Sequence, residues 1–279
     1  MKSWKKTAFA SMATVALATV MGLTACGNTT TPAAGSSTSG SDDATITTLD
    51  EGKLTFATSP DYPPFENLVD GEYVGLDMDL GRAIAEELDL ECVYTNIDFD
   101  GIVPAIVAGG QADAGLSGIS ITPEREEQVD FSDPYYVDNQ AVAVMSDNTE
   151  LTEDNAAEAL NSETVTIAVQ SGSTGEAHAG EYFPNAEIIS FPNFTDCFAA
   201  VQAGKADAVC GNSAVVEQML SGAYDNEHVI YTSATGEEYA IAVSKDNPEL
   251  LAAINDAIAK LKEDGTLDEL IVKNMGGEA

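Results

Sequence analysis

Positively charged residues are scarce in this sequence of 279 residues. Lysine and arginine together number 11 against 47 aspartates and glutamates, which gives a formal net charge of −36. A chain with this charge repels phosphate backbones and anionic lipid headgroups, so the composition argues against nucleic-acid binding and electrostatic adhesion to membranes. The excess of acid is typical of a solvated, soluble surface.

Histidine and cysteine are also rare, with 2 and 4 copies. His178 and His228 lie in no catalytic motif, and the GxSxG, HExxH and P-loop patterns are absent. Cys92, Cys197 and Cys210 have apolar neighbours and form no CxxC pair, so we expect neither a metal nor another cofactor. Cys197 and Cys210 are either buried free thiols or partners in a disulfide.

The first 25 residues have the pattern of a signal peptide. Three lysines precede an apolar segment, 8–23, which is too short and too interrupted by Ser and Thr for a permanent transmembrane helix. Residues 23–27 read LTACG and resemble the lipobox of bacterial lipoproteins, in which the cysteine is lipidated and becomes N-terminal. Cys26 is therefore predicted to carry the lipid anchor, palmitate included, and the alternative is an ordinary cleavage site. Residues 26–51 then form a polar, flexible tether.

Residues 97–136 are the most informative stretch of the chain. Their pattern predicts a helix over 100–107 with Asp100 as N-cap, a strand over 112–118, and a second helix that begins at Pro123. Arg125 therefore follows the end of a strand, where open α/β sheets bind small ligands. An arginine fork there suits a carboxylate, and the alternative is a solvated helix charge.

The second half of the chain repeats a pattern of the first. Residues 108–114 read AGGQADA and residues 203–208 read AGKADA, and each leads from a predicted helix into a predicted strand. Length, a hydrophobic content of 44% and this repeat predict two similar α/β domains around a shared cleft. The remaining pattern predicts strands over 53–58, 90–95, 140–145, 164–169, 186–191 and 239–243, and helices over 77–88, 150–162, 195–202, 248–263 and 267–273.

A set of motifs across residues 52–276 resembles one protein family. They are SPDYPPFE (59–66), FDGIVPAIVAGGQADA (99–114), GISITPER (118–125), VQSGSTGE (169–176) and AGKADAV (203–209). Together they resemble the solute-binding proteins of bacterial amino-acid ABC importers, the polar amino-acid type of family 3. The resemblance implies an α/β, type II periplasmic-binding-protein-like fold of two lobes with the ligand cleft between them. Lobe 1 would comprise 52–140 and 236–276, and lobe 2 would comprise 144–232.

The resemblance also implies a set of ligand-binding residues from both lobes. They are Ser59, Tyr62, Phe99, Ser117, Gly118, Ser120, Arg125, Ser173, Thr174 and Asn212. Arg125 would hold the ligand carboxylate in a bidentate manner, together with Thr174 and the loop N–H groups around Ser173. Tyr62 and Phe99 would pack on the aliphatic part of the ligand. A zwitterion that leaves water needs both of its charges paired.

Two positions near the expected ammonium group depart from the family pattern. Ser120 and the backbone of Ser117 and Gly118 would take this group, but Asn212 stands where the family usually has an aspartate, and Ser59 stands where members that recognise basic or amide side chains often carry an acid. The departures favour a small or polar neutral amino acid, or a ligand whose nitrogen is absent or modified. The acidic residues that could compensate are Asp61, Glu66, Asp98 and Asp100.

The expected function is a binding module rather than an enzyme. A lipid-anchored monomer on the extracytoplasmic face of the cell membrane would close on an amino acid by hinge motion and deliver it to ABC permease subunits. One alternative is an enzyme on the same scaffold, similar to a dehydratase, with a carboxylate as its base. The other is a sensory solute-binding lipoprotein without a transporter.

Overall fold

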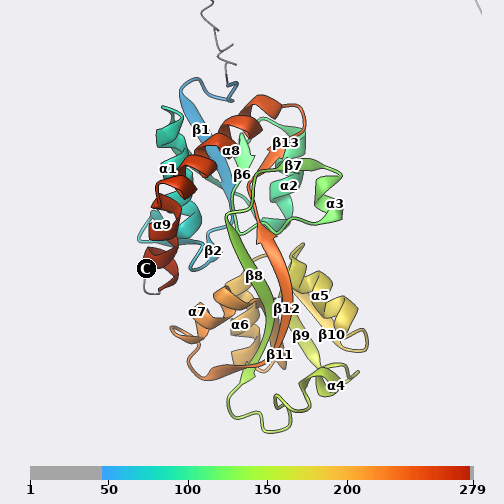
Figure 1. Ribbon diagram of the computed structural model, residues 1–279. Coiled ribbons are helices and arrows are strands. Elements are labelled where there is room, and N and C mark those ends of the chain that lie inside the picture. The colour runs from blue at the N-terminus through green and yellow to red at the C-terminus, as the bar shows by residue number, and fades with distance from the viewer. Residues whose placement is uncertain (1–45, 277–279) are drawn as a thin grey trace, which may run out of the picture. The chain divides into compact units, whose positions relative to one another are not determined.

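Two five-stranded sheets organise the part of the chain that the structure, a computed structural model, describes, residues 46–276 (Figure 1). The predicted signal peptide, Cys26 and most of the tether lie outside the described residues. Each sheet is flanked by helices, and we refer to the two sheets with their helices as lobe 1 and lobe 2.

Lobe 1 contains the sheet β5-β1-β6-β13-β7. Its strands are β1 (Lys53–Thr58), β5 (Glu91–Asn96), β6 (Ala114–Gly115), β7 (Val129–Phe131) and β13 (Ala242–Ser244). β1 runs parallel to β5 and β6, whereas β13 is antiparallel to β6 and β7. The C-terminal part of the chain thus supplies a strand to the sheet begun by β1.

Side chains alternate between the two faces of the lobe 1 sheet along each strand, so each face carries apolar residues. Helices cover both faces and bury these residues. Leu54 and Phe56 belong to the core beneath α1 (Leu76–Glu87), α8 (Pro248–Glu263) and α9 (Thr266–Met275). Ala57 faces a separate core with Ile102 and Ile106 of α2 (Phe99–Ala108). The short helix α3 (Pro123–Glu126) precedes β7, and a small sheet of β2 (Asp61–Tyr62), β3 (Glu66–Val69) and β4 (Glu72–Val74) precedes α1.

Lobe 2 contains the sheet β10-β9-β11-β8-β12. Its strands are β8 (Tyr136–Met145), β9 (Thr166–Gln170), β10 (Glu187–Phe191), β11 (Ala208–Asn212) and β12 (Glu227–Tyr239). Its helices are α4 (Ala156–Leu160), α5 (Thr174–Tyr182), α6 (Phe194–Gln202) and α7 (Ser213–Leu220). The parallel strands β9 and β11 end just before α5 and α7, so residues at these strand ends and helix starts face the same edge of the sheet.

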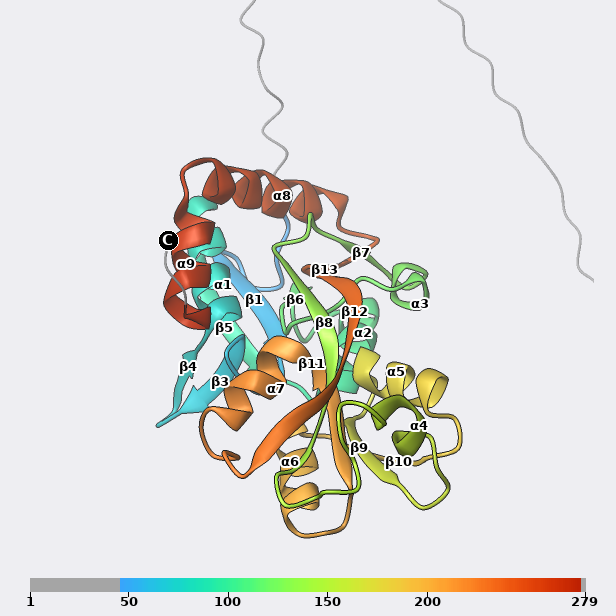
Figure 2. The same cartoon turned by 60° about the horizontal axis from the view of Figure 1, so that its bottom comes forward.

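Two long strands connect the lobes. β8 and β12 pair antiparallel from Glu227↔Met145 to Tyr239↔Tyr136, and Figures 1 and 2 show them side by side. Their register shifts between Ser233 and Glu237, so the segment 234–236 bulges out of the ladder. At the far end, Tyr239 forms a bridge with Ser120 of lobe 1. β12 therefore belongs to the lobe 2 sheet while its last residues reach lobe 1.

Two predicted helix starts are confirmed by their hydrogen bonds. The Thr122 hydroxyl accepts from the Arg125 N–H, with Pro123 as the first helical residue. The Asn247 side chain accepts from the Leu250 N–H in the same way. Among the residues that the structure describes, Cys92, Cys197 and Cys210 are free thiols, and the last two are fully buried.

Three predicted elements are wrong in detail. The N-cap of α2 is Asp98 rather than Asp100. The predicted helix 150–162 reduces to α4, because Asn148 and Asn155 bond the loop backbone before it and stabilise turns instead. The predicted strand 239–243 is divided between β12 and β13, since Ala240 donates to the Ile119 carbonyl where the chain passes between sheets.

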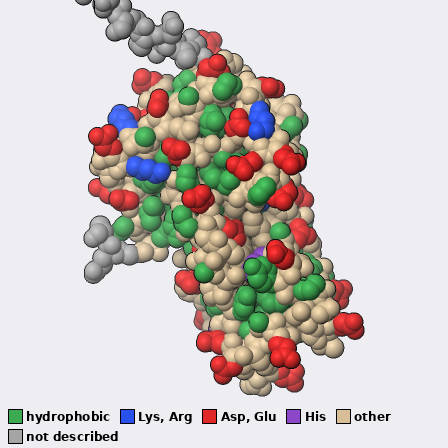
Figure 3. All heavy atoms as spheres, turned by 45° about the vertical axis from the view of Figure 1, so that its right-hand side comes forward, with side chains coloured by type: hydrophobic (Ala, Val, Ile, Leu, Met, Phe, Trp, Pro, Cys, Tyr) green, Lys and Arg blue, Asp and Glu red, His purple; other side chains and the backbone are tan. Residues whose placement is uncertain are grey.

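The predicted strand 112–118 is also shorter than expected, because only Ala114 and Gly115 lie in β6. Of β12, only the last residue, Tyr239, lay within a predicted strand. The described surface matches the expectation from composition, since Figure 3 shows acidic side chains scattered over the face drawn and few basic ones.

Candidate ligand-binding site

Residues of the two lobes meet at the predicted site through direct hydrogen bonds. The Tyr62 hydroxyl donates to Asn212 Oδ1 at 2.7 Å, and Arg125 Nη2 donates to the Gly172 carbonyl at 3.0 Å. The hydroxyls of Ser120 and Thr174 lie 3.5 Å apart. Predicted ligand-binding residues that are far apart in sequence therefore lie together.

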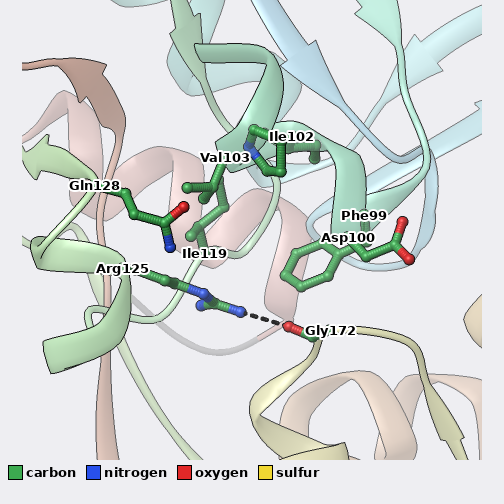
Figure 4. A pocket seen from close by; sticks show the side chains of 9 residues that line it. Phe99, Asp100, Ile102, Val103, Ile119, Arg125, Gln128 and Gly172 are labelled. Atoms are coloured by element: carbon green, nitrogen blue, oxygen red, sulfur yellow. Dashed lines mark hydrogen bonds between the residues drawn. The ribbon is translucent and has the colours of Figure 1, made fainter. Parts of the chain in front are cut away.

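Arg125 projects from the start of α3 into the space between the lobes (Figure 4). Its Nη1 donates to the Ser120 carbonyl at 2.7 Å, and the guanidinium lies 5.4 Å from the centroid of the Phe99 ring. Burial lowers the pKa of Arg125 from its usual value, while the negative charge of Glu237 opposes that shift. The ion pairs in residues 46–276 do not include Arg125, so carbonyl dipoles and the more distant carboxylates of Glu237 and Glu124 balance its charge.

A cavity of about 190 Å³ lies beside the Arg125 guanidinium. Phe99, Ile102, Val103 and Ile119 supply apolar walls, and the Gln128 amide supplies a polar one. Asp100 also lines the cavity, but its carboxylate points away from Arg125 (Figure 4) and accepts from the Ser171 hydroxyl at 3.0 Å. The cavity thus combines one cation with mostly apolar surface.

The N-terminus of α5 faces Arg125 from lobe 2. Ser173 is the N-cap, and its hydroxyl accepts from the Glu176 N–H while donating to the Gln170 carbonyl. Gly172 adopts φ +71°, and a Cβ there would lie 2.8 Å from the Asp100 Cβ, so the close approach of the lobes requires glycine. A helix N-terminus opposite a guanidinium is an arrangement suited to an anion.

Asn212 is buried at the end of β11 and contacts both lobes. Its Oδ1 accepts from Tyr62, and its Nδ2 donates to Glu237 Oε2 at 3.1 Å and to the Asn139 carbonyl at 3.5 Å. The carboxylate of Glu237 can only accept, so the amide nitrogen must face it. Asn212 therefore acts as a neutral bridge between a phenol and a carboxylate.

Glu237, on β12, is the residue that sequence reasoning missed. Its carboxylate accepts from Ser120 Oγ at 2.7 Å, Thr174 Oγ1 at 2.6 Å and Gln140 Nε2 at 2.7 Å, in addition to Asn212. Burial would raise its pKa, but these hydrogen bonds outweigh burial and hold the pKa below its usual range. The sequence offered only a weak signal, the acidic pair before Tyr239.

Ser117 and Gly118 face a buried acidic pair behind the site. The Ser117 hydroxyl donates to Glu66 Oε1 at 2.7 Å, and the Gly118 N–H donates to Asp77 Oδ2 at 2.7 Å. Burial raises the pKa of Asp77 to about 6, and burial followed by repulsion from Asp77 raises the pKa of Glu66 well above its usual range. Tyr135 also donates to Asp77 at 2.9 Å. The pair thus holds the Ser117 side chain and the Gly118 backbone in place.

The other acids considered for the ammonium group have other positions. Asp61 accepts from the Ser59 hydroxyl at 3.1 Å and from the N–H of Phe194 at the start of α6. Asp98 is exposed at the start of α2, and Asp100 is hydrogen-bonded to Ser171. Ser59 is buried, and its N–H donates to the Ser117 hydroxyl. Glu237 is the acid that contacts Asn212.

Within residues 46–276, no cluster of His, Cys, Asp and Glu suits a metal ion. None of the helices in this part of the chain is long and apolar enough to cross a membrane. His178 is buried on α5, and His228 lies on β12.

The family model for bacterial extracellular solute-binding proteins, family 3, matches residues 54–277. The chain belongs to this family. The resemblance seen in the sequence motifs is thereby confirmed. The match covers both lobes and the two strands that connect them.

Curated relatives and a solved structure agree with this assignment. The chain is 33% identical to the ABC transporter arginine-binding protein 1 of Escherichia coli over 78% of its own length and 88% of that protein. It is 30% identical to an ABC transporter glutamine-binding protein of Bacillus subtilis over 94% of this chain and 95% of that one. The crystal structure of an ancestral amino acid-binding protein, a precursor of cyclohexadienyl dehydratase, matches with a TM-score of 0.75 and 37% identity over 80% of this chain and 96% of that chain. The predicted two-lobe α/β fold is confirmed.

Proposed function

We propose that this protein is the substrate-binding lipoprotein of an ABC importer, which captures an amino acid between its lobes and delivers it to permease subunits. The observation that carries the proposal is the position of Arg125. Its charge lies between the lobes, has no ion-pair partner in the described part of the chain, and faces the N-terminus of α5. A ligand carboxylate is the group that completes this arrangement.

The carboxylate would be held from both lobes. Arg125 can turn its two nitrogens from the carbonyls of Ser120 and Gly172 toward a ligand, which then receives a bidentate pair of hydrogen bonds. Thr174 and the first N–H groups of α5 approach from the other lobe. The lobes would close on the ligand by hinge motion about β8 and β12. A ligand that contacts both lobes stabilises the closed state, because only the closed state makes both sets of contacts.

We further propose that the ligand side chain is neutral or polar. The cavity beside Arg125 has apolar walls and one amide, Gln128. Asp61 is hydrogen-bonded to Ser59 and to the N–H of Phe194, and the Asp100 carboxylate points away from Arg125. A basic ligand side chain would need a carboxylate as its partner, and neither Asp61 nor Asp100 is available for that role.

The membrane anchor belongs to the same proposal. Cys26, outside the described residues, would carry the lipid, and the predicted tether 26–51 would hold a monomeric binding unit on the extracytoplasmic face, except that Thr47 and Leu49 at its end are hydrogen-bonded to lobe 1. The described residues, 46–276, include both lobes, so a soluble form that starts at about Thr45 is suitable for binding measurements.

The test is a thermal-shift screen of this soluble form with the standard amino acids, their derivatives and small carboxylates, followed by calorimetry of each hit. We expect a neutral or polar α-amino acid to raise the melting temperature most. If arginine proves to be the strongest ligand, the proposal of a neutral or polar ligand side chain is wrong, but the proposed amino-acid-binding function stands. No shift with any amino acid would overturn the function.

An enzyme on the same scaffold is the second candidate, and one observation favours it. Burial raises the pKa of Asp138 to about 6, and this carboxylate accepts from the hydroxyl of Tyr239 near the site. The solved relative that is a precursor of a dehydratase makes turnover worth measuring. Chromatography of each hit after long incubation with the protein distinguishes catalysis from binding. A permease gene beside this one would separate a transport role from a sensory one.

A further inference from the structure

A buried amino acid brings two charges into the site, and each needs a partner of opposite sign. Arg125 provides the positive partner for the carboxylate. Asn212 provides no charge for the ammonium group, although it lies at the end of β11 against Tyr62. The negative partner must therefore come from another residue.

The position of Glu237 meets this requirement. One oxygen, Oε2, accepts from Ser120, Thr174 and Asn212, three residues that come from different elements of the two lobes. The other oxygen accepts from Gln140 Nε2 at 2.7 Å and Thr235 Oγ1 at 3.1 Å. Glu237 thus places a full negative charge at the centre of the residues proposed to bind the ligand.

The fold explains how β12 brings this carboxylate into the site. The ladder with β8 shifts register between Ser233 and Glu237, and Gly236 has φ +64°. The Gly236 N–H donates to Asn139 Oδ1 at 3.1 Å, which holds the bulge against β8. Glu238, the next residue, is exposed on the opposite side of the strand. The bulge therefore sets which of two adjacent glutamates faces the ligand.

We infer that Glu237 is the anionic partner of the ligand ammonium group, in place of the aspartate that Asn212 replaces. The inference rests on the proposed function and deepens it, because it assigns the substrate class. A site with one cation, Arg125, and one anion, Glu237, matches a zwitterion with a free α-ammonium group. It selects against N-acylated amino acids and against simple carboxylates, which leave the Glu237 charge without a partner.

Because Glu237 lies on a strand that connects the lobes, donors from both lobes reach its carboxylate. The Gln140 amide on β8 and the Thr174 hydroxyl on α5 both donate to this carboxylate, while Ser120 reaches it from lobe 1. An ammonium group that joins Glu237 needs only the neighbouring hydroxyls to turn, since a hydroxyl can donate or accept. Asn212 can keep its amide bond to the carboxylate and its bond from Tyr62.

The experiment compares Glu237→Gln with Glu238→Gln, a matched control one residue along the same strand. Calorimetry uses the amino acid that gives the largest shift with the unaltered protein, and the carboxylic acid that lacks only its α-amino group. We expect Glu237→Gln to weaken binding of the amino acid by about 30-fold or more and to leave or improve binding of the desamino acid. Glu238→Gln should change neither.

The double variant Glu237→Gln/Asn212→Asp tests the charge rather than the position. It restores one carboxylate beside Tyr62, so we expect amino-acid affinity to recover by at least 10-fold over Glu237→Gln. Circular dichroism of each ligand-free variant confirms that it is folded before binding is measured.

The remaining outcomes overturn the inference. Equal affinity of Glu237→Gln and the unaltered protein for the amino acid would show that Glu237 is not its partner. Tighter binding of the amino acid by Glu237→Gln would show that this carboxylate competes with the ligand carboxylate instead. In both cases the unaltered protein still binds an amino acid, so the proposed function stands. If the unaltered protein binds none, the function itself fails.

Discussion

Two acidic centres flank the candidate site, and their carboxylates differ in how many hydrogen-bond donors reach them. Glu66 and Asp77 are fully buried; Glu66 accepts from the Ser117 hydroxyl, and Asp77 accepts from Tyr135 and the Gly118 N–H. Within the described residues, one oxygen of each carboxyl has no other donor, so a proton shared between the two satisfies both. Glu237 is a single carboxylate that accepts five hydrogen bonds.

The comparison shows that donors, and not depth alone, decide whether a buried acid keeps its charge. Desolvation raises the pKa of both acids of the Glu66–Asp77 pair, so the pair binds a proton more readily than ordinary carboxylates and serves as a support for the ligand site. Hydrogen bonds lower the pKa of Glu237 despite its burial, so it stays an anion that can attract a cation. A supporting role and a recognition role thus follow from the same side-chain chemistry.

The largest effect is expected from Arg125→Ala, which leaves the Glu237 charge without a nearby cation and the ligand without its bidentate partner. We expect the loss of roughly 4 kcal/mol of binding free energy, because one member of a buried charge pair is removed. Ligand-induced thermal stabilisation should disappear. Arg82→Ala, which removes a half-exposed arginine of α1 paired with Asp79, is the control and should bind normally. Unchanged affinity of Arg125→Ala in calorimetry would contradict the carboxylate assignment.

Asp77→Asn tests whether the Glu66–Asp77 pair holds a proton. The folded-state pKa of Asp77 is about 6 against an ordinary value of 3.8, so the folded protein binds more protons and loses stability as the pH rises from about 4 to 6. Asparagine does not titrate. The free energy of unfolding of the variant minus that of the unaltered protein should therefore increase over this range, by roughly 3 kcal/mol at most.

Urea denaturation at pH 4 and pH 7 measures this difference for Asp77→Asn. Asp61 and Asp138 also have pKa values raised to about 6, and their contributions cancel because they are present in both proteins. A difference that stays constant between the two pH values would mean that Asp77 is ionised throughout.

The smallest effect, with the opposite sign, is expected from Glu237→Gln in the absence of ligand. Because its pKa lies below the usual 4.5, Glu237 contributes stability that is complete above pH 4.5 and is lost as the pH falls through its folded-state value. We expect the variant to be less stable at pH 7 by about 1.5 kcal/mol, the lower end of the range for hydrogen bonds to a charged group. Thermal unfolding at pH 7 and pH 3 should show the gap closing in acid. If the difference in stability between the variant and the unaltered protein increases in acid, the pKa of Glu237 is raised like that of Asp77 and not lowered.

Sequence reasoning succeeded where the signal was local. Thr122-Pro123 and Asn247-Pro248 begin their helices as predicted, because a cap and a proline at the first helical position act within one turn. Strand β1 covers the predicted residues without change. The motifs also led to the family and to the two-lobe fold.

Sequence reasoning failed where a residue depends on a distant partner. Residues 227–239 contain Ser, Thr, Gly and Glu in no regular alternation, so nothing local predicts a strand of this length. β12 forms because β8 lies beside it, and β8 is about a hundred residues earlier in the chain. Missing β12 meant missing Glu237, and it directed attention to Asp61 and Glu66, whose positions only the fold reveals.

The sequence by itself determined the family, the two-lobe α/β architecture, the starts of its best-capped helices and the placement of Arg125 after a strand. Only the tertiary structure decided which acid faces Asn212. Helix caps and hydrophobic patterns act through neighbours along the chain and can be read from the sequence. The charge state of a buried carboxylate depends on desolvation and on donors from other elements, and these exist only once the lobes and their connecting strands have folded together.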